Sequence, residues 1–110
     1  MDLRFDGNLV RGGREARERF YDTRGYGWPV DGAVAFDPVE AAHLLYRGDV
    51  ADIDGRDFQG FLRSKAVPET DFLVYKDLRD RGFYLSTASD PAVEEESNVD
   101  FVVYPRGKGP

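Results

Sequence analysis

The stretch Asp37-Pro38-Val39-Glu40-Ala41-Ala42-His43-Leu44-Leu45-Tyr46-Arg47-Gly48 is the strongest structural signal in this sequence. It predicts a helix, because Asp37 can accept hydrogen bonds from free backbone N–H groups and Glu40 completes a capping box. Pro38 suits the first helical position, and Gly48 is a natural left-handed helix end. The apolar residues between these ends predict that the helix packs against a core.

Short strands and one more helix are expected before this helix. Residues 4–11 have the pattern of two strands around an Asp-Gly-Asn turn. Residues 14–22 are typical of a charged helix that directs its few apolar side chains toward a core. Residues 30–36 alternate apolar and small side chains, so they predict a strand.

The pattern continues with three more elements. Residues 50–53 predict a short strand, and Asp57 can cap a helix whose aromatic and leucine side chains recur at helical spacing. Pro68 marks the expected domain boundary. Beyond it, residues 69–81 predict a helix with one apolar stripe, ended by Gly82.

Two strands, residues 83–86 and 99–104, are expected last, separated by a polar loop that contains Glu94-Glu95-Glu96. The element order predicts the α+β class. Residues 1–67 would form a small N-terminal domain of short strands and three helices. Residues 68–110 would supply the first helix and two strands of an incomplete α/β domain, which exposes both edges of its sheet.

The composition predicts a small, acidic, soluble protein. Its 110 residues carry 21 acidic and 15 basic side chains, for a net charge of −6. Asp outnumbers Glu 14 to 7 and Arg outnumbers Lys 12 to 3, which fits a very salty cytoplasm where the Debye length shrinks to roughly 3 Å. An ordinary acidic protein is the alternative. Without cysteine, disulfides and thiolate metal sites are excluded. With no long apolar run or signal peptide, we expect a cytoplasmic protein without membrane contact.

Four segments together resemble a known family. Residues 74–84 read Val-Tyr-Lys-Asp-Leu-Arg-Asp-Arg-Gly-Phe-Tyr, and residues 100–107 read Asp-Phe-Val-Val-Tyr-Pro-Arg-Gly. With Gly-Tyr-Gly at 25–27 and the Pro-Val-Glu-Ala-Ala-His-Leu-Leu helix start at 38–45, they resemble archaeal tRNA-splicing endonucleases. This resemblance assigns residues 1–67 to the family's N-terminal domain and residues 68–110 to the start of its catalytic-like domain.

The resemblance implies a function. Such enzymes remove introns from precursor tRNA at bulge-helix-bulge sites, without a metal or other cofactor, and leave 2′,3′-cyclic phosphate and 5′-hydroxyl ends. A tyrosine is thought to deprotonate the attacking 2′-OH, a histidine to protonate the leaving oxygen, and a lysine to stabilise the charged phosphorane. Acid and base must lie on opposite sides of an in-line displacement, which explains these residue types.

The family's functional residues map only in part. Tyr104 matches the position of the catalytic tyrosine. A tyrosine base needs a nearby cation or strong hydrogen bonds to ionise, and Arg106 and Lys108 are the local candidates. Arg79, Arg81, Arg106 and Lys108 are candidates for RNA binding. The alternative for these basic residues is a solvated surface that pairs with neighbouring aspartates. For Tyr104 it is a core or edge tyrosine.

The sequence also departs from the catalytic pattern. His43, the one histidine, lies far upstream of Tyr104, so we expect a structural role, and no lysine stands where the catalytic one would. Three adjacent glutamates, 94–96, would repel a phosphate backbone. They form either a solubilising loop or a segment that docks into a basic pocket of a partner. The chain therefore resembles the first, non-catalytic repeat of a two-repeat homodimeric enzyme, truncated before the catalytic histidine and lysine.

Two functional hypotheses follow. In the first, the chain is a structural part of a tRNA-splicing endonuclease, inactive alone, whose partners are precursor tRNA and the catalytic half or another endonuclease subunit. In the second, it is a non-catalytic acidic α+β module that binds a protein or RNA partner. Both hypotheses predict that the isolated chain does not cut RNA.

Overall fold

A computed structural model of the chain describes residues 3–64, 67–87, 91 and 101–104. It contains both helices and strands, with antiparallel strand pairs separated by runs of helix, as expected for the α+β class. The strands are β1 (Arg4–Phe5), β2 (Val10–Gly12), β3 (Trp28–Val30), β4 (Ala33–Phe36), β5 (Leu85–Thr87) and β6 (Phe101–Val103). The helices are α1 (Arg14–Ala16), the π-helical η1 (Arg17–Asp22), α2 (Pro38–Arg47), α3 (Phe58–Arg63) and α4 (Glu69–Asp80).

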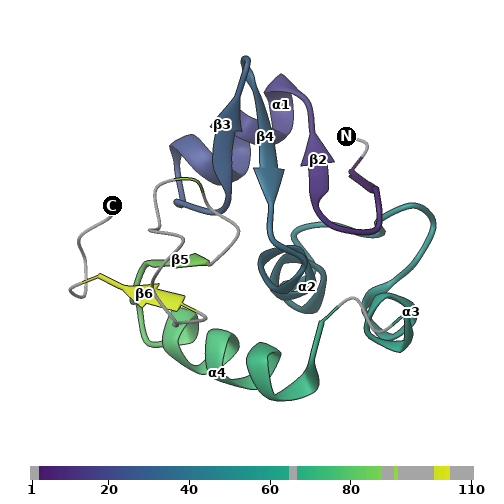
Figure 1. Cartoon of the computed structure of the whole chain (residues 1–110), viewed down its shortest axis with the longest axis vertical. Helices are drawn as coiled ribbons and strands as arrows, with labels where there is room; N and C mark the ends of the chain where they lie inside the picture. Colours follow the sequence, from purple (N-terminus) through teal and green to yellow (C-terminus); the bar gives the residue numbers. More distant parts are fainter. Residues whose placement is uncertain (1–2, 65–66, 88–90, 92–100, 105–110) are drawn as a thin grey trace.

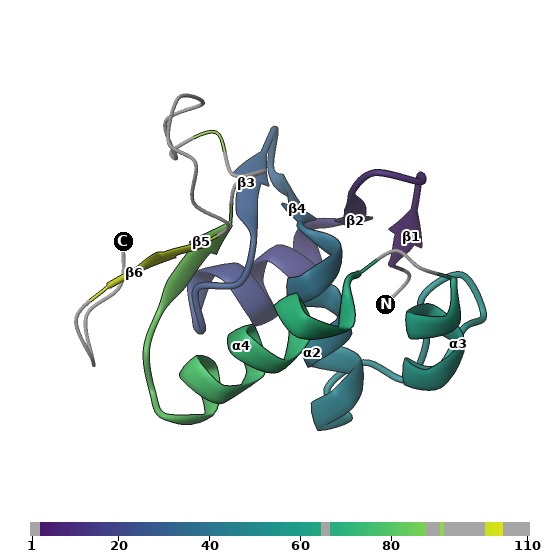
Figure 2. The same ribbon diagram turned by 60° about the horizontal axis from the view of Figure 1, so that its bottom comes forward.

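Helix α2 occupies the centre of the molecule (Figure 1). The four-stranded sheet, in the order β1-β2-β4-β3, lies on one side of it, and α4 crosses it on the other. Figure 2 shows α4 crossing α2, with α3 at one end of the molecule and the β5–β6 pair at the other. One hydrophobic core joins these parts, because Phe36 of β4, Leu44 of α2 and Tyr75 of α4 belong to the same buried cluster.

The capping signals of α2 are confirmed. The Asp37 side chain accepts from the backbone N–H of Val39, and the Glu40 carboxyl accepts from the N–H of Asp37, which closes the capping box. Gly48 has a φ of 80°, and its N–H donates to the last turn. The helix predicted after Asp57 and the one predicted over residues 69–81 are confirmed as α3 and α4.

Residues 30–36 were predicted to form one strand, but they contain the last residue of β3, a two-residue turn and β4. Asp31 (φ 47°) and Gly32 (φ 83°) form its turn, and both positive φ angles fit the right-handed twist of the two strands. The hairpin pairs Trp28 with Ala35 and Val30 with Ala33. Strand β3 therefore begins at Trp28, before the predicted strand.

The prediction of a strand at residues 50–53 is wrong. The backbone N–H groups of Asp49 and Val50 still donate to Leu44 at the end of α2, so they are not available to a neighbouring strand. Ile53 instead pairs with Arg56 in a tight turn.

Two predicted boundaries also shift. The predicted helix at residues 14–22 widens into the π-helix η1 after one turn, a rare geometry that apolar spacing does not reveal. Strand β5 begins at Leu85, two residues later than predicted, because the N–H of Phe83 still bonds to the carbonyl of Leu78 in α4. Strand β6 lies within the predicted range 99–104, and the predicted loop with Glu94–Glu96 is outside the described residues.

Candidate functional site

Tyr104 follows β6 and lies against the neighbouring strand. Its backbone N–H donates to the carbonyl of Tyr84 at 2.9 Å, and its hydroxyl lies 3.1 Å from the hydroxyl of Ser86. The side chain is half-buried. Its two candidate cations, Arg106 and Lys108, are outside the described residues. The described contacts of Tyr104 are those of a strand residue, and its proposed catalytic role stays a prediction.

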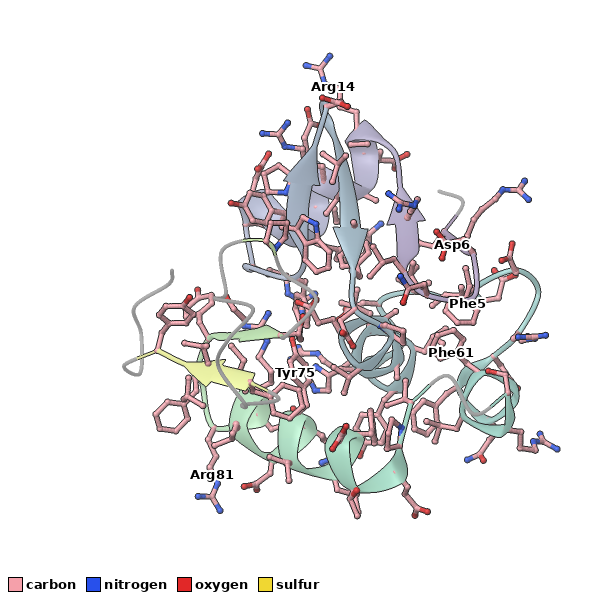
Figure 3. All side chains as sticks on the ribbon, viewed as in Figure 1. Phe5, Asp6, Arg14, Phe61, Tyr75 and Arg81 are labelled. Carbon is pink, nitrogen blue, oxygen red and sulfur yellow. The ribbon has the colours of Figure 1, made fainter. Side chains whose placement is uncertain are left out.

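The two predicted RNA-binding arginines of the α4 region differ in their surroundings. Arg81 is exposed, points away from the molecule (Figure 3), and pairs with Asp77 at 3.3 Å. Arg79 is half-buried, and none of its described contacts is an ion pair with a carboxylate. The alternative of a solvated face that pairs with aspartates therefore describes Arg81 and not Arg79.

Arg79 is held between the segment that precedes β3 and the segment that precedes β5. Its Nη2 donates to the backbone carbonyl of Arg24 at 3.0 Å. Its guanidinium carbon lies 3.8 Å from the ring centre of Tyr26 and 5.3 Å from that of Tyr84. These distances are typical of cation–π contacts, in which a cation, most often arginine, lies above the face of an aromatic ring. Residues more than fifty positions apart in the sequence thus form one cluster.

This cluster lines an open pocket of about 260 Å³, here called the arginine pocket. Its lining residues are Thr23, Arg24, Tyr26, Arg47, Arg79, Gly82, Phe83 and Tyr84. Asp49 is 2.9 Å from a guanidinium nitrogen of Arg24 and 3.3 Å from Nε of Arg47. Two of the three guanidinium groups therefore share one carboxylate, and that of Arg79 has no carboxylate partner among the described contacts. A positive charge is left at the opening of an otherwise acidic chain.

Two other pockets are less favourable to an anion. One, of about 390 Å³, is lined by Arg4 together with Asp52 and Asp54. The other, of similar volume, is lined by two arginines with Glu18 and Asp22. The acidic side chains outnumber the basic ones in the first pocket and equal them in the second, so the arginine pocket is the stronger candidate site for an anion.

A buried histidine lies beneath the arginine pocket. His43 is fully buried on α2, with Nδ1 at 2.9 Å from the Tyr26 hydroxyl and Nε2 at 3.1 Å from Asp80. Burial lowers the pKa of His43 to about 4, against a smaller opposing effect of its hydrogen bond to Asp80. The ring is therefore neutral at pH 7. The hydrogen bonds from Lys76 and His43 help to keep the Asp80 carboxyl ionised, so it can only accept hydrogen bonds. The proton of the His43 ring is therefore on Nε2, which donates to Asp80, and Nδ1 accepts from the Tyr26 hydroxyl.

Glu40 forms the other half of this buried layer. Its carboxyl accepts from the N–H of Gly27 at 2.7 Å and from that of Asp37 at 2.9 Å. Burial raises the pKa of Glu40 to about 8, despite these two hydrogen bonds. The mostly protonated carboxyl thus leaves the charge of Arg79 uncompensated at neutral pH. Glu40 thus fixes the backbone at Gly27, and His43 fixes the side chain of Tyr26, which lines the pocket.

Arg24, Arg47 and Tyr26 were not among the site residues predicted from the sequence, although Gly-Tyr-Gly at 25–27 is one of the segments that carry the family resemblance. Within the part of the chain that the structure describes, no group of three His, Asp or Glu side chains could hold a metal ion. None of the described helices is long and apolar enough to cross a membrane.

Residues 1–63 match the family described as tRNA intron endonuclease, N-terminal domain. The chain belongs to this family. The family predicted from the four sequence segments is thereby confirmed. Full-length relatives cover more of the chain than this domain does, and they extend the similarity into α4 and the β5–β6 pair.

Three relatives show the extent of the similarity, and each is called tRNA-splicing endonuclease. The chain is 64% identical over 110 residues to the one from Haloarcula marismortui, 50% over 109 residues to that from Halobacterium salinarum, and 33% over 117 residues to that from Methanosarcina acetivorans. These alignments cover 100%, 97% and 100% of this chain but 33%, 32% and 31% of the relatives. The chain spans about a third of the length of the curated relatives it matches.

Proposed function

We propose that this chain is a structural part of a tRNA-splicing endonuclease, an RNA lyase that removes introns from precursor tRNA. The observation that carries the proposal is the 64% identity to such an endonuclease over all 110 residues. The reaction is cleavage at bulge-helix-bulge sites, with attack of a 2′-OH on the adjacent phosphate and expulsion of the 5′-oxygen. The products carry a 2′,3′-cyclic phosphate and a 5′-hydroxyl.

The surroundings of His43 support a structural rather than a catalytic role. Both ring nitrogens are already hydrogen-bonded, the side chain is closed to solvent, and its low pKa leaves the ring uncharged and unable to act as an acid at pH 7. Lys76 is 2.9 Å from Asp80 and is therefore already paired. The chain thus offers Tyr104 as the only match to the family's three catalytic positions.

The catalytic histidine and lysine would come from the catalytic half or another endonuclease subunit, in an assembly with two-fold symmetry. In that assembly, this chain would hold its partner and contact precursor tRNA. Arg79, Arg81, Arg106 and Lys108 are the proposed RNA contacts. The acidic, lysine-poor composition supports operation in a cytoplasm of high salt, and the relatives from Haloarcula and Halobacterium agree with this habitat.

The experiment that tests this function is cleavage of an end-labelled bulge-helix-bulge RNA in concentrated KCl. Three reactions are compared: this chain alone, a His- and Lys-bearing catalytic half alone, and the mixture. The catalytic half is taken from the remaining two thirds of the Haloarcula marismortui relative. We expect cutting at both intron borders in the mixture only, with 3′ ends that are blocked until the cyclic phosphate is removed.

Cutting by this chain alone would overturn the structural role. No cutting in the mixture, together with no RNA binding, would favour the acidic binding module instead. The Tyr104→Phe variant serves as a control in the mixture. We expect it to cut at the wild-type rate, because the hydroxyl it loses is bonded to Ser86. A large loss of rate would assign a catalytic role to Tyr104.

A further inference from the structure

The arginine pocket is the one place among the described residues where three guanidinium groups and aromatic faces meet at an opening. We propose that it binds a phosphate of a single-stranded RNA segment, with the adjoining unpaired base stacked on Tyr84. This inference rests on the proposed function, which makes RNA the substrate, and it names the place of contact. The proposed site contains the predicted contact Arg79 and adds Arg24, Arg47, Tyr26 and Tyr84 to it. Arg81, another predicted contact, does not line this pocket.

Charge is the first argument. The chain as a whole has a net charge of −6 and would repel a polyanion. Among the described residues, no acidic side chain lines the arginine pocket, and the carboxylate of Asp49 beside it is shared between Arg24 and Arg47. In concentrated salt, only groups within a few ångströms of a phosphate contribute, so this local excess of positive charge matters more than the net charge.

Pre-organisation is the second argument. The guanidinium of Arg79 is fixed by the Arg24 carbonyl and the Tyr26 ring before any ligand arrives. Tyr26 is itself held by its hydrogen bond to His43 beneath the pocket. A fixed arginine loses little side-chain entropy on binding, and its planar fork matches two oxygens of a phosphate. A purely structural role for Arg79 would explain its stacking, but not why Arg24 and Arg47 meet it at the same opening.

The aromatic wall is the third argument, and it favours RNA over an acidic peptide. Tyr84 and Phe83 are half-buried at the rim, so part of each ring remains open to a ligand. Unpaired RNA bases stack on such rings, and each stacked base contributes about 1–3 kcal/mol in proteins that bind single strands. A glutamate or aspartate side chain would satisfy the arginines but would leave the rings unused. A nucleotide supplies both the anion and the flat ring.

The test measures binding of a short, fluorescently labelled single-stranded RNA to the 110-residue chain over a KCl series. The variant is Arg47→Ala, because this side chain is 44% exposed and its loss is expected to leave the fold intact. The matched control is Arg14→Ala, which removes the same charge from an 85% exposed ion pair outside the pocket. Fluorescence of Trp28, which is buried in β3, checks the fold of each variant.

We expect Arg47→Ala to weaken RNA binding roughly 3- to 10-fold. It should also lower the slope of log K against log salt by about 0.7–1, the value for one lost phosphate contact. Arg14→Ala should change neither quantity. A second variant, Tyr84→Ala, should weaken binding while leaving the salt slope unchanged, because it removes a stacking surface and no charge. Inorganic phosphate should compete with the RNA only at high concentration, since it lacks the base.

Equal weakening by Arg47→Ala and Arg14→Ala would overturn the proposal, because it would show diffuse electrostatic attraction. Displacement of the RNA by a glutamate-rich peptide that binds more tightly would also overturn it, in favour of a protein partner. The cleavage assay in the mixture is independent of both results. Cutting without pocket binding would leave the proposed function intact, whereas pocket binding without cutting would reject the endonuclease role and keep the RNA site.

Discussion

Acidification should remove most of the stability that neutral His43 contributes to the fold. The ring accepts a hydrogen bond from Tyr26 and donates one to Asp80, so it joins α2 to the start of β3 and to the end of α4. Protonation would place a charge in a fully buried position and would turn the acceptor Nδ1 into a donor that faces the Tyr26 hydroxyl. Both effects favour the unfolded chain.

The magnitude follows from the two pKa values. His43 titrates near 6.5 when unfolded and at about 4 when folded, and each unit corresponds to about 1.4 kcal/mol. The unfolded chain binds the proton first, so stability is fully present above pH 6.5 and is lost as the pH falls toward 4. The expected loss is about 3 kcal/mol, a large part of the roughly 5–15 kcal/mol typical of a small domain.

Urea unfolding followed by Trp28 fluorescence measures this loss, at several pH values between 7 and 4 and in constant KCl. The comparison is with His43→Leu, which fills the same space and does not titrate. Asp6 has a lowered pKa from its hydrogen bonds to backbone N–H groups, and Glu40 has a raised one from burial, so the wild-type profile alone mixes several groups. The difference between the two chains isolates His43 and its contacts.

At pH 7 the leucine variant should be less stable by about 1–3 kcal/mol, because Tyr26 and Asp80 each lose a partner. This gap should close or reverse by pH 4, since only the wild type bears the cost of protonating the ring. A gap that stays constant from pH 7 to pH 4 would refute the reasoning. It would mean that the buried histidine is already charged, or that it is not closed to solvent.

Three further substitutions test the layer around the pocket and the last strand. The wild-type free energy of unfolding should fall by up to about 5 kcal/mol as the pH rises from 4.5 to about 8, because the raised pKa of folded Glu40 makes its ionised form costly. Glu40→Gln should abolish this fall, and urea midpoints at pH 5 and 9 measure it. Gly27→Ala should lower the free energy of unfolding by about 3 kcal/mol or more, because the added methyl group would collide with the Ala35 carbonyl and the backbone φ is +75°. The control Gly32→Ala, at a φ of +83° with open space around it, should lower it by about 1 kcal/mol in the same assay. Tyr104→Phe should lower the thermal midpoint only slightly, since it removes one half-buried hydrogen bond of about 1 kcal/mol.

The elements with a local chemical signal were predictable from the sequence. Helix α2 has such a signal at both ends, because Asp37 and Glu40 cap one and Gly48 ends the other. The apolar stripe of α4 is equally plain, and Tyr75 and Phe72 are buried as that stripe predicts. The family assignment also depended on local motifs, which is why the sequence alone was sufficient for it.

The missed elements depend on competition between neighbouring segments. Asp31-Gly32 is a strong hairpin signal, but the alternation of residues 30–36 concealed it. Residues 50–53 have strand composition, yet the end of α2 uses the backbone donors of Asp49 and Val50. Such outcomes depend on which acceptor a donor meets first in three dimensions, and residue spacing carries no information about this.

The arginine pocket shows the same limit for function. Arg24, Arg47 and Arg79 belong to a turn, a helix end and another helix, and only the packing of α4 against α2 brings them together. The net charge of −6 argued against RNA binding, because it gives a carboxylate far from the pocket the same weight as one beside it. Since Asp49 is shared by two arginines and Glu40 is mostly protonated at pH 7, the local charge has the opposite sign to the total. In concentrated salt, the sign of the local charge decides whether a phosphate can bind.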